Sequence, residues 1–392
     1  MQEATPVNVI FLSPHFPANN YLYCTALRAA GANVLGVGDG PYDALRPELK
    51  VALAEYYFLP RMESYDDLAR AVGELVRKHG AADRIESLNE YWLGHEARLR
   101  QDFNVWGPRP ADLERTRRKT GMRNVFRQAG IPIAEGEAVT GAEQLERFAR
   151  RHGFPLIFKP DVGVGAAHVF PVRDYAELKP HLLDPPQGYV VEKFVRGELV
   201  TFDGLTDRDG RIVFWTSMTV CAGIMEIVTE LRQMSYIFQR RIPAALEALG
   251  RKAVRGFGLK ERFFHTEFIR EGGERYTALE INVRPPGGFS VDMMNYQCDF
   301  DLFRVWAELL TKGQVETAYE RKYYVAHAAR RDGCRYRHSH EEVLRRLMPL
   351  VAAHMAMPQI FSPAMGNYTY LIRHAELGPL KEAIAFVQEL AE

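Results

Sequence analysis

The sequence predicts an α/β protein that begins with a parallel β-sheet and contains antiparallel structure farther along. Val7–Ser13 is an apolar run typical of a buried strand, Asn19–Ala32 has the pattern of a helix, and Asn33–Asp39 is a second strand. Strand, helix and strand in succession form a βαβ unit, which joins parallel strands. Phe263–Arg284 predicts two strands joined by a tight turn. With 392 residues, the chain is long enough for two or three domains.

The rest of the N-terminal region continues this alternation. Ser64–Gly80 predicts a helix, because it starts with a good N-cap, has acidic residues in its first turn and ends with glycine. Arg84–Glu90 is a further strand, and its last residues Asn89 and Glu90 would face a ligand crevice, although surface loop residues are the simpler interpretation. Glycine and proline in Asn104–Pro110 break the pattern, so we place a domain boundary after residue 108.

The central region predicts two helices and two strands. Ala111–Gly130 is a helical stretch that ends at glycine, and Gln144–Gly153 is a second helix. Phe154–Asp161 is a short apolar strand that carries Lys159 near its end, and Tyr189–Val195 is another strand.

The composition is that of an ordinary globular protein and excludes several classes of function. Fifty basic and fifty acidic residues give zero net charge, so bulk charge predicts no nucleic-acid partner and no membrane-surface partner. The N-terminus lacks the pattern of a signal peptide, and no apolar run is long enough to span a membrane. We therefore expect a soluble, cytoplasmic protein. Its four cysteines are widely spaced, which predicts reduced thiols and no zinc site: Cys24, Cys221, Cys298 and Cys334.

Two familiar phosphate-binding sequences are missing. The loop after the first strand, Ser13–Asn20, contains no glycine, whereas a dinucleotide-binding domain has Gly-x-Gly-x-x-Gly there. Gly36–Pro41 follows the second strand and carries proline where the last glycine should stand. No Walker A sequence occurs. A NAD enzyme and a P-loop enzyme therefore lose their main support.

The loop after Lys159 is a better candidate for phosphate binding. Gly163, Gly165, Ala166 and Ala167 carry almost no side chain, so backbone N–H groups there can approach phosphate oxygens closely. Lys159 supplies a compact positive charge for the same phosphates. The alternative interpretation of this segment is a flexible hairpin beside a solvated lysine.

The hairpin at Phe263–Arg284 predicts a metal site. A two-residue turn at Gly272-Gly273 would place Glu267 opposite Ala278 and His265 opposite Glu280. In that register four polar side chains share one face: His265, Glu267, Glu280 and Asn282. The other face is apolar and predicts core: Phe264, Phe268, Leu279 and Ile281. Two carboxylates and an amide oxygen suit Mg²⁺, with substrate phosphates as further ligands. The alternative is an exposed acidic sheet face.

These segments, in this order, resemble the ATP-grasp superfamily, and within it the carboxylate–amine ligases such as the L-amino-acid ligases. The resemblance runs from about residue 7 to residue 375. It implies an ATP-grasp fold with an N-terminal Rossmann-like parallel-sheet domain over residues 1–108. Two α+β lobes would then hold the nucleotide, namely a central lobe over residues 109–190 with the phosphate loop and a C-terminal lobe over residues 191–392 with the metal site.

The resemblance also implies a role for each matching residue. The metal ligands would be Glu267, Glu280 and Asn282, and the catalytic residues Arg284 and Lys159, with Arg284 holding the substrate carboxylate. Backbone groups of Lys193 and Val195 would read the adenine edge. The residues assigned to ATP are Lys119, Lys159, Gly163, Gly165, Ala166, His168, Glu192, Lys193, Val195 and Glu198.

The chain departs from the family pattern at the ribose site. The family has an acidic residue two positions after the hinge glycine, where this chain has Leu199, and Glu198 stands one residue early. A strand would point Glu198 to the opposite face. No general base is evident, since His168 and His265 are the only candidates and a lone histidine is more often structural.

The reaction that the resemblance implies is activation of a carboxylate by ATP as an acylphosphate, followed by attack of an amine and release of ADP and phosphate. The partners are small-molecule carboxylate and amine substrates, with amino acids as one class, and a homodimer is a further expectation. Alternatives are another ATP-grasp reaction, such as carboxylation or thioester formation, and a nucleotide-binding protein without catalysis. The sequence does not specify which acid or amine is used.

Overall fold

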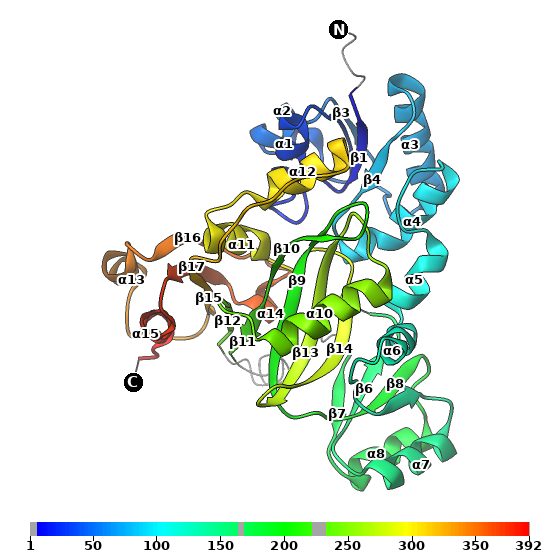
Figure 1. Ribbon diagram of the computed structural model, residues 1–392, viewed down its shortest axis with the longest axis vertical. Coiled ribbons are helices and arrows are strands. Elements are labelled where there is room, and N and C mark those ends of the chain that lie inside the picture. Colours follow the sequence, from blue (N-terminus) through cyan, green and yellow to red (C-terminus); the bar gives the residue numbers. More distant parts are fainter. Residues whose placement is uncertain (1–5, 164–167, 222–232, 392) are drawn as a thin grey trace.

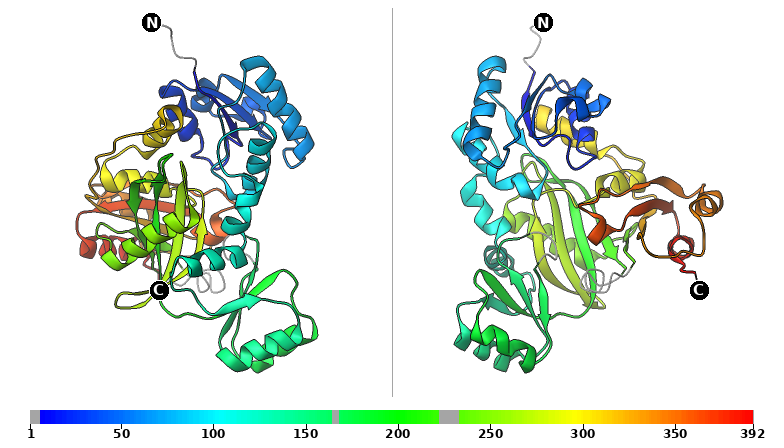
Figure 2. Two further views of the ribbon diagram at one scale, coloured as in Figure 1. Left: turned by 45° about the vertical axis from the view of Figure 1, so that its right-hand side comes forward. Right: turned by 180° about the vertical axis from the view of Figure 1, so that it is seen from behind.

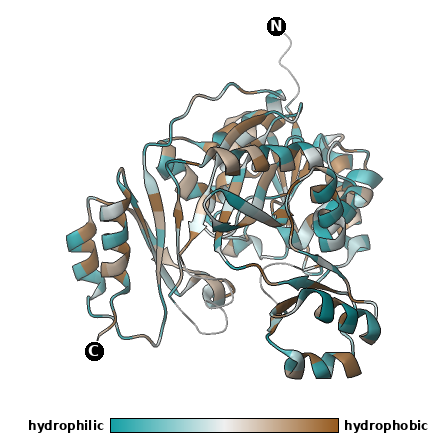
Figure 3. Cartoon of the chain, turned by 60° about the horizontal axis from the view of Figure 1, so that its bottom comes forward, coloured by the Kyte–Doolittle hydropathy of each residue, from teal (hydrophilic) through white to brown (hydrophobic). Residues whose placement is uncertain are grey.

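The computed structural model describes residues 6–163, 168–221 and 233–391, and the strands in these ranges form three sheets. Figure 1 shows the N-terminal sheet at one end of the molecule, the largest sheet in the middle and the smallest sheet in a lobe at the other end. In the turned views of Figure 2 this small lobe still projects from the body. Peripheral helices show hydrophobic and hydrophilic residues side by side in Figure 3, as expected where one helix face is buried.

The N-terminal domain contains the predicted parallel sheet. Its strand order is β3-β2-β1-β4, and all pairs are parallel. The strands are β1 (Asn8–Leu12), β2 (Asn33–Gly38), β3 (Glu55–Phe58) and β4 (Arg84–Glu86). The helices are α1 (Tyr21–Ala29), η1 (Tyr42–Ala44), α2 (Pro47–Ala52), α3 (Tyr65–His79), η2 (Glu90–Trp92) and α4 (Leu93–Asp102). Ser64 caps α3 as predicted, because its side chain accepts a hydrogen bond from the Asp67 N–H.

Both faces of this sheet are buried, and a distant helix covers one of them. Alternate residues of β1 enter two different cores, with Phe11 in one and Ile10 in the other. The core around Phe11 includes Trp306 of α12 (Leu302–Lys312), and the two rings meet edge to face at 6.4 Å between centroids. A helix from the C-terminal part of the chain therefore completes the core of the N-terminal domain.

The predicted single helix over Ala111–Gly130 is two helices. These are α5 (Pro110–Arg117) and α6 (Lys119–Gln128), separated by Arg118, whose ψ of 127° is extended. Arg118 forms a bridge with Val162, and this long-range pairing overrides the local helical pattern. Gly121 lets α5 and α6 pack closely, because a Cβ there would lie 2.1 Å from the Glu114 carbonyl oxygen.

The small lobe contains a four-stranded antiparallel sheet of order β5-β8-β6-β7. Its strands are β5 (Gly136–Ala138), β6 (Leu156–Pro160), β7 (Phe170–Val172) and β8 (Tyr189–Lys193), with helices α7 (Ala142–His152) and α8 (Tyr175–Leu183). Leu145 of α7 and Leu178 of α8 pack in the same core as Phe158 of β6. The sheet reaches Lys193 at the end of β8, three residues beyond the predicted lobe boundary at residue 190.

The large sheet has nine strands in the described part of the chain. Its order is β14-β13-β9-β11-β12-β15-β17-β16, and β10 also pairs with β9. The strands are β9 (Glu198–Thr206), β10 (Ile212–Thr216), β11 (Met218–Val220), β12 (Ser235–Phe238), β13 (Phe263–Gly272), β14 (Arg275–Asn282), β15 (Tyr324–Arg330), β16 (Val351–Ala356) and β17 (Tyr368–His374).

Helices cover this sheet from several parts of the chain. They are α10 (Ala244–Phe257), α11 (Ser290–Cys298), α12, α13 (His340–Leu347), α14 (Ser362–Met365) and α15 (Leu377–Gln388). Figure 1 shows α10 lying across β9, β13 and β14, and Phe257 of α10 packs in one core with Phe202 and Phe268. The opposite face of these three strands carries polar residues such as His265 together with apolar residues such as Leu199 and Phe263, which pack in another core.

Within the described ranges, no helix combines the length and the apolar composition that crossing a membrane requires. The four cysteines are free thiols, with Cys24 and Cys298 buried and Cys221 and Cys334 exposed.

A buried ion network joins the N-terminal domain to the large sheet. Arg262, just before β13, contacts Glu86 at the end of β4 at 2.5 Å, and Glu86 also pairs with Arg100 of α4 at 3.0 Å. Arg100 in turn pairs with Glu96 at 2.6 Å. All four side chains are buried. Removing one member of such a network leaves an uncompensated buried charge, so the network specifies how the two parts dock.

We predict that Arg262→Leu destabilises the protein by about 3 kcal/mol, because Glu86 and Glu96 then share a single buried cation. Urea unfolding followed by tryptophan fluorescence measures the loss. The double variant Arg262→Leu with Glu86→Leu should recover part of the stability, since it removes one of the uncompensated charges. Arg173→Leu breaks an exposed pair with Glu177 and serves as the control, with an expected effect below about 1 kcal/mol. Equal effects of the two single variants would contradict the role of the network.

Candidate active site

The predicted metal-binding side chains lie on the hairpin of β13 and β14, but the register differs from the predicted one. Glu267 lies opposite Glu280, and His265 lies opposite Asn282. The prediction that Glu267 faces Ala278 and that His265 faces Glu280 is therefore wrong. Because the pairing at Glu267 and at His265 moves by two residues, their side chains and those of Glu280 and Asn282 keep their side of the sheet. The four polar side chains still share one face.

The shift arises at the turn, which lies at Gly273 and Glu274 instead of Gly272 and Gly273, so that Gly272 pairs with Arg275. Two further irregularities in the pairing offset each other. One lies between Arg270 and Gly272, and the other between Glu267 and Phe268. The second places an extra residue in β14 next to Ala278. Ala278 therefore packs in the core under α10, whereas Leu279, which we predicted to enter this core, packs against the cluster on the other side. On the outer side of β14, Ala278 forms a bridge with Ile133, and its N–H donates to the Pro132 carbonyl oxygen at 2.8 Å, so this β-bulge depends on a segment far away in the sequence.

The direct opposition of Glu267 and Glu280 puts two negative charges side by side. Directly opposite residues have their Cβ atoms about 5 Å apart. Burial and the charge of Glu267 raise the pKa of Glu280, although Lys119 partly offsets this at 3.8 Å from the Glu280 carboxylate. The amide nitrogen of Asn282 donates to the Glu280 carboxylate at 3.1 Å. Additional positive charge next to Glu267 and Glu280 would therefore stabilise the ionised form of both carboxylates.

His265 is a counter-ion in this site and does not have the properties of a general base. Its Nδ1 lies 2.6 Å from buried Asp203 of β9, and its Nε2 lies 3.1 Å from Glu267. Burial lowers the pKa of the imidazole, but the carboxylates of Asp203 and Glu267 outweigh burial and raise it to about 10. Burial would raise the pKa of Glu267, but the imidazolium and nearby Lys159 and Arg284 hold it below its usual value.

Lys159 reaches the same face from the small lobe. Its ammonium group lies 2.7 Å from Glu192, which also pairs with Arg123 of α6 at 2.8 Å. Burial opposes the charge of Lys159, but the carboxylates of Glu192, Glu280 and Glu267 outweigh burial and raise its pKa. Glu192, predicted to lie beside adenine, is thus engaged by two cations. Lys159 is therefore charged and positioned between the small lobe and the hairpin.

Asp161 connects the segments that carry Lys119 and Lys159, the two lysines predicted to bind phosphate. The sequence analysis did not identify this aspartate. Its carbonyl oxygen accepts the Lys119 N–H at 2.8 Å. Its carboxylate accepts from the N–H and the hydroxyl of Thr120, both at 2.9 Å, and pairs with Arg118 at 2.9 Å. Asp161 therefore fixes the start of α6, with Lys119, next to the end of β6, with Lys159. An aspartate two residues after a strand lysine is too weak a local signal to reveal this.

The remaining nucleotide predictions fall into three groups. Gly163 and His168 border the glycine-rich loop and are exposed, whereas Gly165 and Ala166 lie outside the described residues. Lys193 is exposed and Val195 is half-buried just beyond β8. Glu198 lies opposite Arg270 and forms an ion pair with it. The alternation along β9 places Glu198 on the face away from Asp203, as the departure from the family pattern suggested.

Arg284 lies beyond the metal face and meets the N-terminal domain. Its guanidinium contacts Glu90 at 3.3 Å and donates to the Pro285 carbonyl oxygen at 2.8 Å. Glu90 also contacts Arg117 of α5 at 3.2 Å. Glu90, interpreted from sequence as a surface loop residue, is therefore a bridge between two arginines. Its position after β4, at the carboxyl end of a parallel sheet, was the available signal.

A cavity of about 580 Å³ opens next to Arg284. Its walls come from three places, namely the loops after the N-terminal strands, the segment Arg284–Gly288 and the segment before α14. The large apolar residues in these walls include Phe16, Tyr91, Trp92, Pro286, Ile360 and Phe361. The segment that follows β14 and the carboxyl edge of the N-terminal sheet thus share one cavity.

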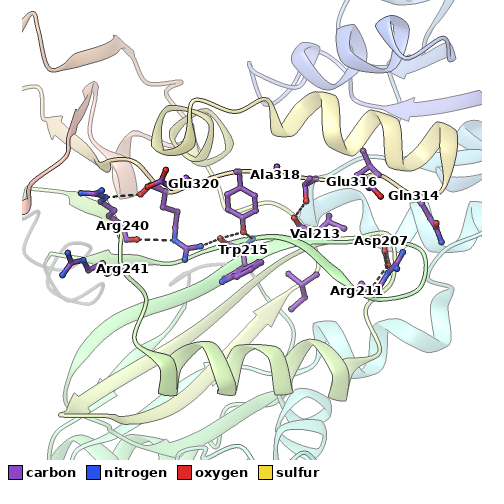
Figure 4. Close-up of a pocket in the computed structure, with 15 residues that line it drawn as sticks. Asp207, Arg211, Val213, Trp215, Arg240, Arg241, Gln314, Glu316, Ala318 and Glu320 are labelled. Carbon is purple, nitrogen blue, oxygen red and sulfur yellow. Dashed lines mark hydrogen bonds and ion pairs between the residues drawn. The ribbon is translucent and has the colours of Figure 1, made fainter.

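A larger cavity of about 960 Å³ contains none of the predicted site residues. Figure 4 shows it along β10, with Trp215 near its centre and Arg211, Arg240 and Arg241 around it. Side chains from the segment before β15 bond the outer edge of β10, for example Tyr319, whose hydroxyl accepts from the Trp215 N–H at 2.9 Å. We therefore take the smaller cavity and its adjoining hairpin, where the predicted charged residues converge, as the candidate active site.

The donor set fits a magnesium ion. Among the described residues, no group of three or more His, Cys, Asp or Glu side chains is arranged to hold a metal. The predicted set has two carboxylates and one amide, so water and phosphate oxygens would supply the other ligands, as is usual for Mg²⁺. The raised pKa of Glu280 beside Glu267 is the observation that favours a cation here, because a cation relieves this repulsion.

Comparison with solved structures identifies the fold. An L-amino acid ligase from Bacillus licheniformis covers 98% of this chain and 97% of its own, with a TM-score of 0.77 at 17% identity. An N5-carboxyaminoimidazole synthetase from Staphylococcus aureus covers 97% of both chains, with a TM-score of 0.75 at 13% identity. The chain has the ATP-grasp fold, as the resemblance implied. No protein-family model matches it.

Curated sequences include relatives of the same type. An L-arginine-specific L-amino acid ligase of Bacillus subtilis is 25% identical over 224 residues, which is 54% of this chain and 54% of that protein. The carbamoyl phosphate synthase large chain of Thermus thermophilus is 24% identical over 282 residues, 66% of this chain and 26% of that protein. The chain thus spans about half or less of the length of these relatives. Their names confirm the resemblance to carboxylate–amine ligases.

We predict that the pKa values of two buried histidines are shifted in opposite directions from the value of an ordinary histidine. Burial among apolar groups lowers the pKa of His327 to about 4, whereas His265 has a pKa of about 10. At pH 7, side-chain nitrogen NMR of the metal-free protein should show His265 protonated on both nitrogens and His327 neutral. His265→Asn identifies the first signal, and titration of His265 near pH 6.5 would contradict the counter-ion role.

The two shifts give opposite effects of pH on stability. The folded pKa of His265 lies above the unfolded value of 6.5, so its contribution is fully present below pH 6.5 and is lost as pH rises through about 10. The folded pKa of His327 lies below the unfolded value, so its contribution is present above pH 6.5 and is lost as pH falls toward 4.

Proposed function

We propose that the protein is an ATP- and Mg²⁺-dependent ligase that activates a carboxylate as an acylphosphate and joins it to an amine, with release of ADP and phosphate. The observation that carries the proposal is the convergence of Glu267, Glu280 and Asn282 with two lysines and Arg284 on one side of the hairpin. Acids that hold a metal and cations that hold phosphate and carboxylate are the groups that this chemistry requires.

In this proposal the acidic residues bind the metal and the basic residues bind the phosphates and the carboxylate. Glu267, Glu280 and Asn282 would hold Mg²⁺, which when bound neutralises charge on the phosphates of ATP. Lys119 and Lys159 would balance the remaining charge on the nucleotide, and Asp161 positions both of them. The loop that contains Gly163 would cover the phosphates and exclude water, since an acylphosphate hydrolyses readily. Backbone groups of Lys193 and Val195 would contact adenine.

Arg284 would hold the substrate carboxylate. Its planar guanidinium can bind a carboxylate through two parallel hydrogen bonds, and Glu90 keeps it oriented toward the cavity. A carboxylate oxygen of the substrate would then attack the γ-phosphate of ATP, and ADP would leave. After phosphoryl transfer, the amine attacks the acyl carbon and expels phosphate. His265 keeps Glu267 ionised throughout, because its positive charge lies next to that carboxylate.

The proposal includes amino acids as one substrate class, because the relatives that cover this chain include an enzyme named as an L-amino acid ligase. Reduced thiols would be consistent with the cytoplasmic location predicted from sequence, and a homodimer also stays a prediction. A carboxylation is the second candidate, because an N5-carboxyaminoimidazole synthetase aligns over nearly the whole chain.

We predict that ATP and Mg²⁺ with pairs of amino acids yield ADP and phosphate in equal amounts, and that Glu280→Gln lowers turnover at least about 100-fold, because a bound metal contributes several kcal/mol of charge stabilisation. A coupled ADP assay and a phosphate assay measure this. Glu274→Gln, at an exposed residue of the hairpin turn, is the matched control and should retain wild-type rates. Release of AMP and pyrophosphate would refute the acylphosphate route, and turnover with bicarbonate alone would favour carboxylation.

We predict that Arg284→Lys lowers kcat/KM for the carboxylate substrate about 50-fold, because lysine loses the bidentate geometry and one charge-assisted hydrogen bond. The Kd of ADP, measured by calorimetry, should change less than about twofold. Arg147→Lys, at an exposed helix position, controls for the substitution itself. A large loss of ADP affinity in Arg284→Lys would place the arginine at the nucleotide instead of the carboxylate.

A further inference from the structure

We infer that the amino acid bound at Arg284 carries a large apolar side chain, and that Phe16 and Phe361 select it. The inference rests on the proposed function and names the substrate class of the same site. It starts from the cavity of about 580 Å³, whose lining combines Arg284 and Glu90 with apolar residues from separate segments. A cavity of this size can accommodate a dipeptide-sized ligand, since small-molecule sites measure about 300–1000 Å³.

Apolar residues of the cavity lining follow directly after each of the two charged residues, Arg284 and Glu90. Pro285 and Pro286 follow Arg284 directly in the chain, and Tyr91 and Trp92 follow Glu90 directly. Two separate segments therefore pass from a charged residue to apolar residues at the same place. An amino acid held by its α-carboxylate at Arg284 extends its side chain among these apolar groups.

A contact between two distant parts of the chain closes this apolar lining. Phe16, in the loop after β1, stacks on Phe361, just before α14, with 5.7 Å between ring centroids and 16° between ring planes. Both rings line the cavity together with Ile360, which is 69% exposed. An exposed isoleucine at the edge of a cavity gains most from a ligand that covers it.

The segment that carries Phe361 is held in place by its own bonds. The Phe361 N–H donates to the Pro358 carbonyl oxygen at 2.9 Å, and the Met365 N–H donates to the Phe361 carbonyl oxygen at 2.8 Å. Met365 packs against Gly288, where a Cβ would lie 2.4 Å from the Met365 methyl carbon. The selecting ring is therefore positioned by the same glycine segment that follows Arg284.

The acidic groups of the cavity do not reverse this preference. Glu90 is neutralised by Arg284 and Arg117 at 3.3 and 3.2 Å. Asp39 lies 3.2 Å from His15, and its side chain is 43% exposed. Glu63 also lines the cavity and is exposed, so solvent screens both of these carboxylates. A basic substrate side chain would need a buried carboxylate beside Phe16 and Phe361, and neither Asp39 nor Glu63 is buried. Preference for lysine or arginine is therefore the opposing outcome of the test.

The test compares kcat/KM for amino acids that differ in the size and charge of the side chain, in the presence of ATP, Mg²⁺ and a fixed second amino acid. We expect kcat/KM for L-phenylalanine and L-norleucine to exceed that for L-alanine, L-lysine and L-glutamate by about 50-fold, as burial of a large apolar side chain allows. L-Norleucine and L-lysine form the sharpest pair, because they share an unbranched stem and differ in the terminal charge. A preference for L-lysine or for L-alanine would overturn the inference.

Variants identify the selecting residues. Phe361→Ala and Phe16→Ala should each reduce the preference for phenylalanine over alanine about tenfold, mainly through KM, and Phe361→Leu should restore most of it. Phe58→Ala, at an exposed phenylalanine of β3 outside the cavity, should leave the preference unchanged. Unchanged preference in both cavity variants would remove Phe16 and Phe361 from the selecting role.

A binding measurement separates this inference from the proposed function. The shift in Tm with L-phenylalanine, L-alanine or L-lysine, in the presence of ADP and Mg²⁺, reports binding without turnover. If L-phenylalanine shifts Tm and no amino-acid pair releases ADP, the proposed function is wrong and the pocket assignment stands. If small or charged amino acids release ADP and apolar ones do not, the ligase stands and this inference is wrong. If neither occurs, both are wrong.

Discussion

The repulsion between Glu267 and Glu280 is the constraint around which this site is built. Two adjacent carboxylates with only 18% of each side chain exposed are stable only with positive charge nearby, and three elements supply it. His265 comes from β13 itself, Lys119 from the start of α6, and Lys159 from the small lobe. In the proposed function, the two lysines that stabilise this pair would also contact the phosphates of a metal–nucleotide complex. The charge balance of the fold and the proposed chemistry therefore have one origin.

The position of these cations depends on how the parts of the chain dock. Asp161 joins the first turn of α6 to the end of β6, so the two lysines form one rigid unit. On the opposite side, buried ion pairs between Arg262 and Glu86 attach β13 to the N-terminal domain. Arg284 lies between these two junctions and meets Glu90 across the domain boundary. Small movements at either junction would change the geometry of the site.

The sequence analysis recovered what depends on local pattern. The parallel N-terminal sheet, the capped helix α3, the β13–β14 hairpin and the shared face of Glu267 and Glu280 were all expected. The register was wrong, because the turn lies one residue later than the Gly-Gly pair indicated. The helix break at Arg118 was missed, because a bridge to Val162 overrides a helical sequence. Leu279 was misplaced because of the bulge in β14, next to the bridge between Ala278 and Ile133.

Strand and helix periodicity, a glycine turn and alternation along β14 are properties of neighbouring residues, so they follow directly from the order of amino acids in this chain. They were sufficient for the α/β class and for the face that His265, Glu267, Glu280 and Asn282 share. The protonation of His265, the engagement of Glu192 and the bridging role of Glu90 arise from residues far apart in sequence. Electrostatic interactions depend on distance in space and on burial, and these exist only once the domains have packed.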